Sequence, residues 1–191
     1  MTKKYTTLVI LILTLMLSRQ FSIIGATPRI RAAQDPPAQE TQGLVLDVKP
    51  TKLVYAKNEP VELDITLRNA GKHRQIVARR LSLGMRITLV ILDPQGKSAK
   101  WCGRISDEIV VLKGNYKTLS PGESVHAKLT ITCGSAKDPG HGGYVLDAPG
   151  KYVIKAAYRL PIPKEDYERA FPNADVIRGP VWAEPITIEL Q

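Results

Sequence analysis

The stretch LDAPGKYVIKAAYRL, residues 146–160, decides the fold class predicted for this chain of 191 residues. It opens with an Ala148-Pro149-Gly150 turn, after which apolar or aromatic side chains occupy every second position: Tyr152, Ile154, Ala156, Tyr158 and Leu160. Such alternation is typical of a β-strand that buries one face and leaves the other in solvent. We therefore expect a strand over residues 151–160 that is entered through a tight turn.

The same period of two recurs along most of the chain. It is clearest in VELDITLRN (61–69) and ESVHAKLTITC (123–133), whereas MRITLVILD (85–93) is apolar on both faces, which indicates a central strand. Proline and glycine in DPQG (93–96) and SPG (120–122) indicate turns. The predicted strands span residues 43–49, 52–56, 60–68, 85–92, 97–102, 109–112, 123–133, 151–160 and 182–190.

One helix is predicted, over PKEDYERAF (163–171), because this segment begins with proline, carries acidic residues in its first turn and ends before Pro172. Successive strands without crossover helices favour two packed sheets. Gly150 and Tyr152 at a strand entry resemble the tyrosine corner of immunoglobulin-like sandwiches, where a Tyr hydroxyl bonds to upstream backbone. The predicted fold class is an all-β, two-sheet antiparallel immunoglobulin-like β-sandwich with one short helix in a long loop.

Several strand-and-turn segments also carry a resemblance to known families. YAKNEPVELDITLRNAG (55–71), ITLVILDPQGKSAKW (87–101), LSPGESVHAKLTI (119–131), APGKYVIKAAY (148–158) and EPITIEL (184–190) together resemble immunoglobulin-like or fibronectin-type-III-like domains of bacterial exported proteins. A strand ending in Asn, an Asp-x-x-Gly turn and Pro-Gly-Glu before a strand more weakly resemble the bacterial intracellular proteinase inhibitor family. The first resemblance implies a β-sandwich scaffold, and the second implies inhibition of a protease.

The first residues have the pattern of a secretory signal peptide. Lys3 and Lys4 precede an apolar segment of about ten residues, which is the length of a signal core and too short for a membrane-spanning helix. We therefore expect a signal peptide over residues 1–26, a flexible leader over 27–42 and a secreted or periplasmic domain over 43–191. An uncleaved signal would be the expected point of membrane contact.

The charge balance favours anionic partners. The chain has 27 Lys and Arg against 18 Asp and Glu, a net charge of +9, and loss of residues 1–26 would remove three basic residues and no acidic one, leaving +6. A moderate positive charge suits contact with anionic surfaces such as polysaccharide. Nucleic acid is not an expected partner, because no basic run is interleaved with aromatic residues.

No residue pattern predicts an enzyme, a cofactor or a metal site. The sequence has no GxSxG motif, and His73, His126 and His141 have no ligand spacing to one another or to the cysteines. The two cysteines, Cys102 and Cys133, predict one disulfide in an exported domain. Immunoglobulin strand order could place them at opposite ends of the sandwich, too far apart to pair.

Two long connections, residues 69–84 and 161–182, are expected at the same end of the sandwich and form the predicted binding site. They offer the arginine and aromatic side chains that interface hot spots use: Arg74, Arg79, Arg80, Tyr167, Phe171, Arg178 and Trp182. Alternatively, the apolar residues of the first connection, Ile76, Val77, Leu81 and Leu83, merely cover the edge of the core. The expected function is non-enzymatic binding of a protein or an anionic glycan at the cell envelope, and the alternative is a protease inhibitor that presents a surface loop.

Overall fold

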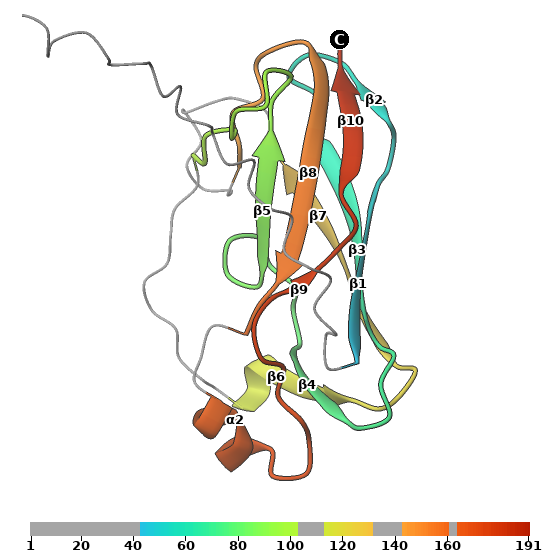
Figure 1. The fold of residues 1–191 in the computed structure, drawn as a ribbon, viewed down its shortest axis with the longest axis vertical. Helices are drawn as coiled ribbons and strands as arrows, with labels where there is room; N and C mark the ends of the chain where they lie inside the picture. Colours follow the sequence, from blue (N-terminus) through green and yellow to red (C-terminus); the bar gives the residue numbers. More distant parts are fainter. Residues whose placement is uncertain (1–42, 103–112, 132–142, 161–163) are drawn as a thin grey trace, which may run out of the picture. The chain divides into compact units, whose positions relative to one another are not determined.

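Most of the stretch 146–160 forms strand β8 (Gly150–Tyr158). In the computed structural model, which describes residues 43–102, 113–131, 143–160 and 164–191, Tyr152, Ile154 and Tyr158 are buried, as the alternating pattern predicts. β8 pairs antiparallel with β10 (Ile186–Leu190) on one side and with β5 (Ile87–Leu92) on the other. It is therefore the centre of its sheet (Figure 1).

The turn before β8 is closed by Tyr152. Its hydroxyl donates a hydrogen bond to the carbonyl oxygen of Ala148 at 2.8 Å and accepts one from the Ala148 N–H at 3.1 Å, which is the contact expected of a tyrosine corner. Gly150 has a φ of 125°, and a Cβ there would lie 2.9 Å from Cγ of Pro94. Glycine is therefore required both by the backbone conformation and by the close approach of the neighbouring turn.

One sheet holds three strands in the order β1–β3–β7. They are β1 (Leu44–Pro50), β3 (Val61–Asn69) and β7 (Ser124–Ile131), and both pairings are antiparallel. Along β3, buried residues alternate with exposed or half-buried ones, because one face covers the core and the other meets solvent.

The second sheet has the order β2–β10–β8–β5, and β9 (Val181–Trp182) also pairs with β8. The short β2 (Val54–Tyr55) lies parallel to β10, whereas β10, β8 and β5 are antiparallel neighbours. The orders β1–β3–β7 and β10–β8–β5 correspond to the A–B–E and G–F–C strands of an immunoglobulin-like sandwich. The structure therefore has the predicted all-β, two-sheet antiparallel fold, with the short helix α2 (Lys164–Ala170) in a long connection.

A third, two-stranded pairing joins β4 (Gln75–Ala78) to β6 (Tyr116–Leu119), which follows the 3-10 helix η1 (Lys113–Asn115). All four residues of β4 are buried, and the Ala78 N–H donates a hydrogen bond to the hydroxyl of Tyr158 at 2.8 Å. The prediction of a continuous loop over residues 69–84 is therefore wrong at residues 75–78, which form β4. Ile76, Val77 and Leu81 belong to the core, as in the alternative interpretation that these residues cover the edge of the core.

Residues 97–102 do not form the predicted strand. Asp93 Oδ1 accepts hydrogen bonds from the N–H groups of Gln95 and Lys97, which closes the turn, but the returning chain then makes isolated β-bridges only, from Ser98 to Leu92 and from Trp101 to Tyr144. β5 consequently lies at the end of its sheet order among the described strands, and its predicted central position is wrong. The apolar second face of β5 is half-buried rather than solvated.

The last predicted strand, 182–190, is divided into β9 and β10. Ala183 N–H still bonds to the carbonyl oxygen of Ala156, but Pro185 has no N–H to donate, so the ladder is interrupted there. The predicted helix over 163–171 matches α2 closely. The predicted strand over 109–112 and the end of the strand over 123–133 lie outside the described residues.

The ends of β5 and β7 bear on the predicted disulfide. Ile131, the last residue of β7, pairs with Val61 at the start of β3. Tyr55, in the strand before β3, pairs with Leu190 of β10, and Leu190 pairs in turn with Gly150. Gly150 lies against Pro94, in the turn that follows β5. β5 and β7 therefore end at the same end of the sandwich, whereas Cys102 lies on the chain that runs back from this end alongside β5, where the Ala99 N–H donates a hydrogen bond to the carbonyl oxygen of Ile91.

Cys102 is half-buried, and its N–H donates a hydrogen bond to the carbonyl oxygen of Gly143 at 3.0 Å. Cys133 lies outside the described residues. The bridge between Cys102 and Cys133 therefore stays a prediction.

Candidate functional site

The two long connections meet, as the sequence predicts. The Asp175 N–H donates a hydrogen bond to the carbonyl oxygen of Arg74 at 2.8 Å, and the Ile76 N–H donates to the carbonyl oxygen of Asp175 at 2.9 Å. Gln75 and Asp175 thereby form a parallel β-bridge. Since β4 is itself paired with β6, these backbone bonds hold the second connection against a fixed part of the fold.

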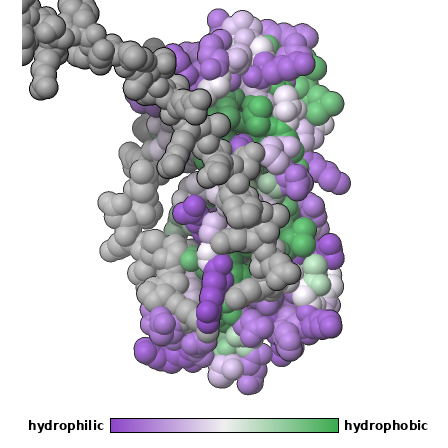
Figure 2. Space-filling model, viewed as in Figure 1, coloured by the Kyte–Doolittle hydropathy of each residue, from purple (hydrophilic) through white to green (hydrophobic). Residues whose placement is uncertain are grey.

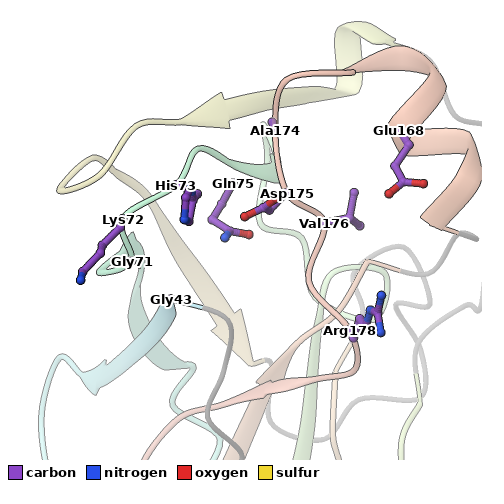
Figure 3. Close-up of a pocket in the computed structure, with 10 residues that line it drawn as sticks. All are labelled: Gly43, Gly71, Lys72, His73, Gln75, Glu168, Ala174, Asp175, Val176 and Arg178. Carbon is purple, nitrogen blue, oxygen red and sulfur yellow. The ribbon is translucent and has the colours of Figure 1, made fainter.

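A cleft of about 500 Å³ lies between the connections, within the size range of small-ligand sites. We call it the loop cleft. Figure 3 shows its residues, which come from the position before β1, the loop before β4, β4 itself, α2 and the segment after α2: Gly43, Gly71, Lys72, His73, Gln75, Glu168, Ala174, Asp175, Val176 and Arg178.

The charged side chains of the loop cleft are of both signs and all are exposed. Lys72 and Arg178 are basic, Glu168 and Asp175 are acidic, and His73 adds an imidazole. Figure 3 shows Glu168 projecting from α2 toward the segment that carries Val176. Exposed charges interact through water and are screened by salt, so a ligand held here would bind in a salt-dependent way.

The basic character of this end originates in one part of the sequence. The chain has no acidic residue between Asp64 and Asp93, and over the same span it carries Arg68, Lys72, Arg74, Arg79, Arg80 and Arg86. β4 lies in the middle of this span and brings most of these residues to the end of the sandwich that carries α2 and β6. In Figure 2 this end is mostly hydrophilic on the face shown.

The four arginines predicted for the site are exposed and fall in two places. Arg178 lines the loop cleft, and Arg74 adjoins it through its backbone bond to Asp175. Arg79 and Arg80 instead line a second cavity of about 350 Å³ beside η1. We call it the arginine hollow; its residues are Arg79, Arg80, Ser82, Met85, Arg86, Gly114 and Asn115.

None of the three aromatic residues predicted for the site lines the loop cleft or the arginine hollow. Tyr167 is a correction: it is fully buried and packs edge-on against Tyr116, with ring centroids 5.0 Å apart, because α2 turns this side chain into the core. Phe171 is half-buried against the core, and Trp182 is half-buried in β9. Tyr167 is therefore not part of an aromatic contact surface.

Burial controls the ionisation of the tyrosines beneath this end. It raises the pKa of Tyr158, whose hydroxyl accepts the Ala78 N–H, and it also raises the pKa of Tyr167. Both phenols stay protonated at neutral pH. Tyr158 contributes packing and a hydrogen bond, whereas Tyr167 contributes packing.

No metal site is formed by the described residues, in which no group of three or more His, Cys, Asp or Glu is arranged to hold an ion. Within the same ranges, no helix is long and apolar enough to cross a membrane. His126 is exposed on β7, with Nδ1 2.9 Å from Oγ1 of Thr66 and Nε2 2.8 Å from Oγ of Ser124. His141 lies outside the described residues.

Comparison with known proteins leaves the family open. No family model matches the chain, and no curated protein matches its sequence. Among solved structures, it is similar to the sporulation control protein Spo0M from Bacillus subtilis (14% identity, TM-score 0.41), covering 78% of this chain and 49% of that one. It is also similar to the CARDB domain of the PF1109 protein from Pyrococcus furiosus (12% identity, TM-score 0.33), covering 80% and 90% of the two chains.

A third similar structure is a β-glucosidase, EmGH1, from Erythrobacter marinus (14% identity, TM-score 0.37), covering 79% of this chain and 16% of that one. The chain thus spans about half the length of Spo0M and a small part of the glucosidase. At these TM-scores none of the three carries an argument about function. The class defined by the structure itself is a β-sandwich with a cleft at its basic end.

Proposed function

We propose that this protein is a non-enzymatic β-sandwich that is exported and binds an anionic glycan at the cell envelope. The observation that carries the proposal is the Gln75–Asp175 bridge, which joins the two connections around the loop cleft at the basic end of the fold. A binding surface held by backbone hydrogen bonds loses little conformational entropy when a ligand arrives.

The choice of an anionic glycan rests on charge. The span between Asp64 and Asp93 supplies basic side chains without acidic ones, and the second connection adds Arg178 together with the acidic Glu168 and Asp175 at the loop cleft. Clustered positive charge attracts polyanions and raises their local concentration. A protein partner would use an apolar centre, and the aromatic residue Tyr167 that could have supplied it is buried.

The inhibitor alternative receives less support from this end of the fold. A protease takes an accessible, extended segment into its active site. Residues of β4 are buried and paired with β6 on one side and with Asp175 on the other. This arrangement favours a binding surface formed by side chains over a presented backbone loop.

The parts of the proposal that concern export and the absence of catalysis rest on the sequence. The signal-like residues 1–26 lie outside the described ranges. The non-enzymatic part rests on the lack of a nucleophile-and-base motif in the chain.

The test is retention of the full chain on an immobilised sulfated polysaccharide along a salt gradient. The double variant R74A/R178A removes two exposed charges at the loop cleft and is expected to elute at clearly lower salt than the wild type. The matched control K49A/K151A removes two exposed charges near the other end of the sandwich and should elute close to the wild type. Equal shifts for both variants, or no retention of the wild type, would overturn the proposal.

A further inference from the structure

Arg86 is a buried guanidinium at the entry of β5. The residue is 6% exposed, and its Nη2 donates a hydrogen bond to the hydroxyl of Tyr116 at 2.6 Å. The guanidinium also lies over the Tyr116 ring, 5.1 Å from the centroid. Its Nη1 is buried with no hydrogen-bond partner in the described part of the chain.

A buried cation of this kind needs a negative partner. Removing an ion from water is costly unless a counter-charge and hydrogen bonds replace the solvent. Among the described residues, the aromatic groups against Arg86 are neutral: the hydroxyl of Tyr116 faces it, and Tyr158 and Tyr167 lie nearby with hydroxyls that stay protonated. The ion pairs within the described residues do not include Arg86.

The arginine hollow brings two more guanidinium groups to the same place. Arg79 is fixed there, because its Nε donates a hydrogen bond to the carbonyl oxygen of Gly114 at 3.0 Å. Arg80 is exposed and reaches the hollow from the next position in the chain. Three like charges around one cavity repel one another unless an anion lies between them.

The remaining lining fits the rest of a ligand. Ser82 and Asn115 are exposed and offer a hydroxyl and an amide for hydrogen bonds. Met85 is 41% exposed, which is unusual for a large apolar side chain and supplies a non-polar contact at the rim. The hollow therefore combines charge, polar donors and one apolar surface, as the sites of small polar ligands do.

The geometry points to the arginine hollow as an oxyanion site, in which Arg79, Arg80 and Arg86 hold a sulfate, phosphate or carboxylate group. Arginine suits this role because its planar fork matches such groups and its charge is spread over the whole guanidinium. The assignment of that group to an acidic sugar rests on the proposed function. The oxyanion site itself does not.

The test is calorimetric titration of the full chain with inorganic sulfate, inorganic phosphate and acetate at constant ionic strength. Saturable one-site binding of at least one of these anions is expected, and the strongest of the three identifies the preferred group. R80A should weaken that binding about tenfold or more, since a hydrogen bond between charged groups contributes at least that factor. Arg80 is exposed, so R80A is expected to keep the wild-type melting temperature.

The matched control is R68A, which also removes one exposed arginine but lies on β3, away from the hollow. It should bind the anion as the wild type does. Absence of saturable binding for all three anions, or equal losses in R80A and R68A, would overturn the inference. Anion binding without retention on the polysaccharide would contradict the proposed function and support the oxyanion site. Retention on the polysaccharide without anion binding would support the proposed function and contradict the oxyanion site.

Discussion

The side-chain amide of Asn69 donates a hydrogen bond to the carbonyl oxygen of Leu119 at 2.9 Å and a second to the carbonyl oxygen of His73 at 2.8 Å. Its Oδ1 accepts the N–H of Gly71 at 3.0 Å. Asn69 is fully buried at the end of β3. One side chain therefore joins β3, the loop before β4 and the end of β6, and it fixes the wall of the loop cleft.

The substitution Asn69→Asp should strongly destabilise the fold. It keeps the shape of the side chain but removes both donated hydrogen bonds and brings a carboxylate toward two carbonyl oxygens, so we expect a loss of about 3 kcal/mol in the free energy of unfolding. Denaturant unfolding measures this. N173D, which makes the same change at an exposed position, should be nearly neutral. Similar stabilities for the two variants would contradict the role given to Asn69.

Tyr152→Phe tests the corner at the other end of the sandwich, before β8. The change removes the hydroxyl that donates to and accepts from the backbone of Ala148, while the ring still fills its place in the core. We expect a loss of about 1–2 kcal/mol in unfolding free energy by thermal or denaturant melting. Y55F provides a comparison, since the contacts of the Tyr55 hydroxyl are 3.3–3.4 Å long, and it should cost less. A larger loss for Y55F than for Y152F would argue against the corner.

The buried tyrosines predict a fall in stability at alkaline pH. Burial raises the pKa of Tyr144, Tyr158 and Tyr167 above the ordinary value of 10.0. Because the folded protein holds these protons more tightly than the unfolded chain, the stability they contribute is complete below pH 10 and is lost as the pH rises above it.

Ultraviolet titration of tyrosinate, followed together with circular dichroism, checks this. The late-titrating phenols should ionise only as the fold is lost, whereas in denaturant all tyrosines should titrate together near their ordinary pKa of about 10. Complete ionisation near that pH with the fold retained would refute the assignment of these residues to the core.

Mass spectrometry after alkylation tests the predicted disulfide between Cys102 and Cys133. Protein isolated from its native compartment should take up no alkylating agent without reductant and two equivalents after reduction. In the chain-entropy account, loss of the bridge should lower the free energy of unfolding by about 3 kcal/mol. Two thiols that react before reduction would contradict both the disulfide and an oxidising compartment.

Most of the sandwich follows from the sequence, because alternation sets which face of a strand is buried. β3, β7 and β8 were predicted on this ground within a few residues of their observed bounds. β4 and β6 were missed. All four residues of β4 are buried, so the segment shows no alternation, and its pairing with β6 depends on a partner about forty positions away.

The position of β5 in its sheet was also beyond sequence reasoning. A strand that is apolar on both faces is usually central, but here the irregular returning chain lies beside β5: the Ala99 N–H donates a hydrogen bond to the carbonyl oxygen of Ile91 at 2.7 Å, and Trp101 packs edge-on against Tyr144 with ring centroids 5.0 Å apart. The Tyr144 hydroxyl in turn donates to the carbonyl oxygen of Leu89 at 2.6 Å. An irregular segment therefore takes the place beside β5 that the sequence assigned to a strand.

The candidate site was predicted in part. The meeting of the two connections followed from strand order, and Arg178 and Arg74 lie at the resulting cleft. Tyr167 was assigned to the surface because a short helix in a loop gives no sign of which face it buries. Arg86 was overlooked because it stands at a strand entry; the absence of acidic residues from 65 to 92 was the signal that could have found it.

The most direct test of the central claim is to map where a sulfated oligosaccharide contacts the isotopically labelled full chain, using backbone amide chemical shifts. The account predicts saturable shifts at residues 71–76 and 174–178, which flank the loop cleft, and none at residues 93–96 and 148–151 at the other end of the sandwich. Shifts confined to the other end, or spread evenly over all basic residues, would contradict it.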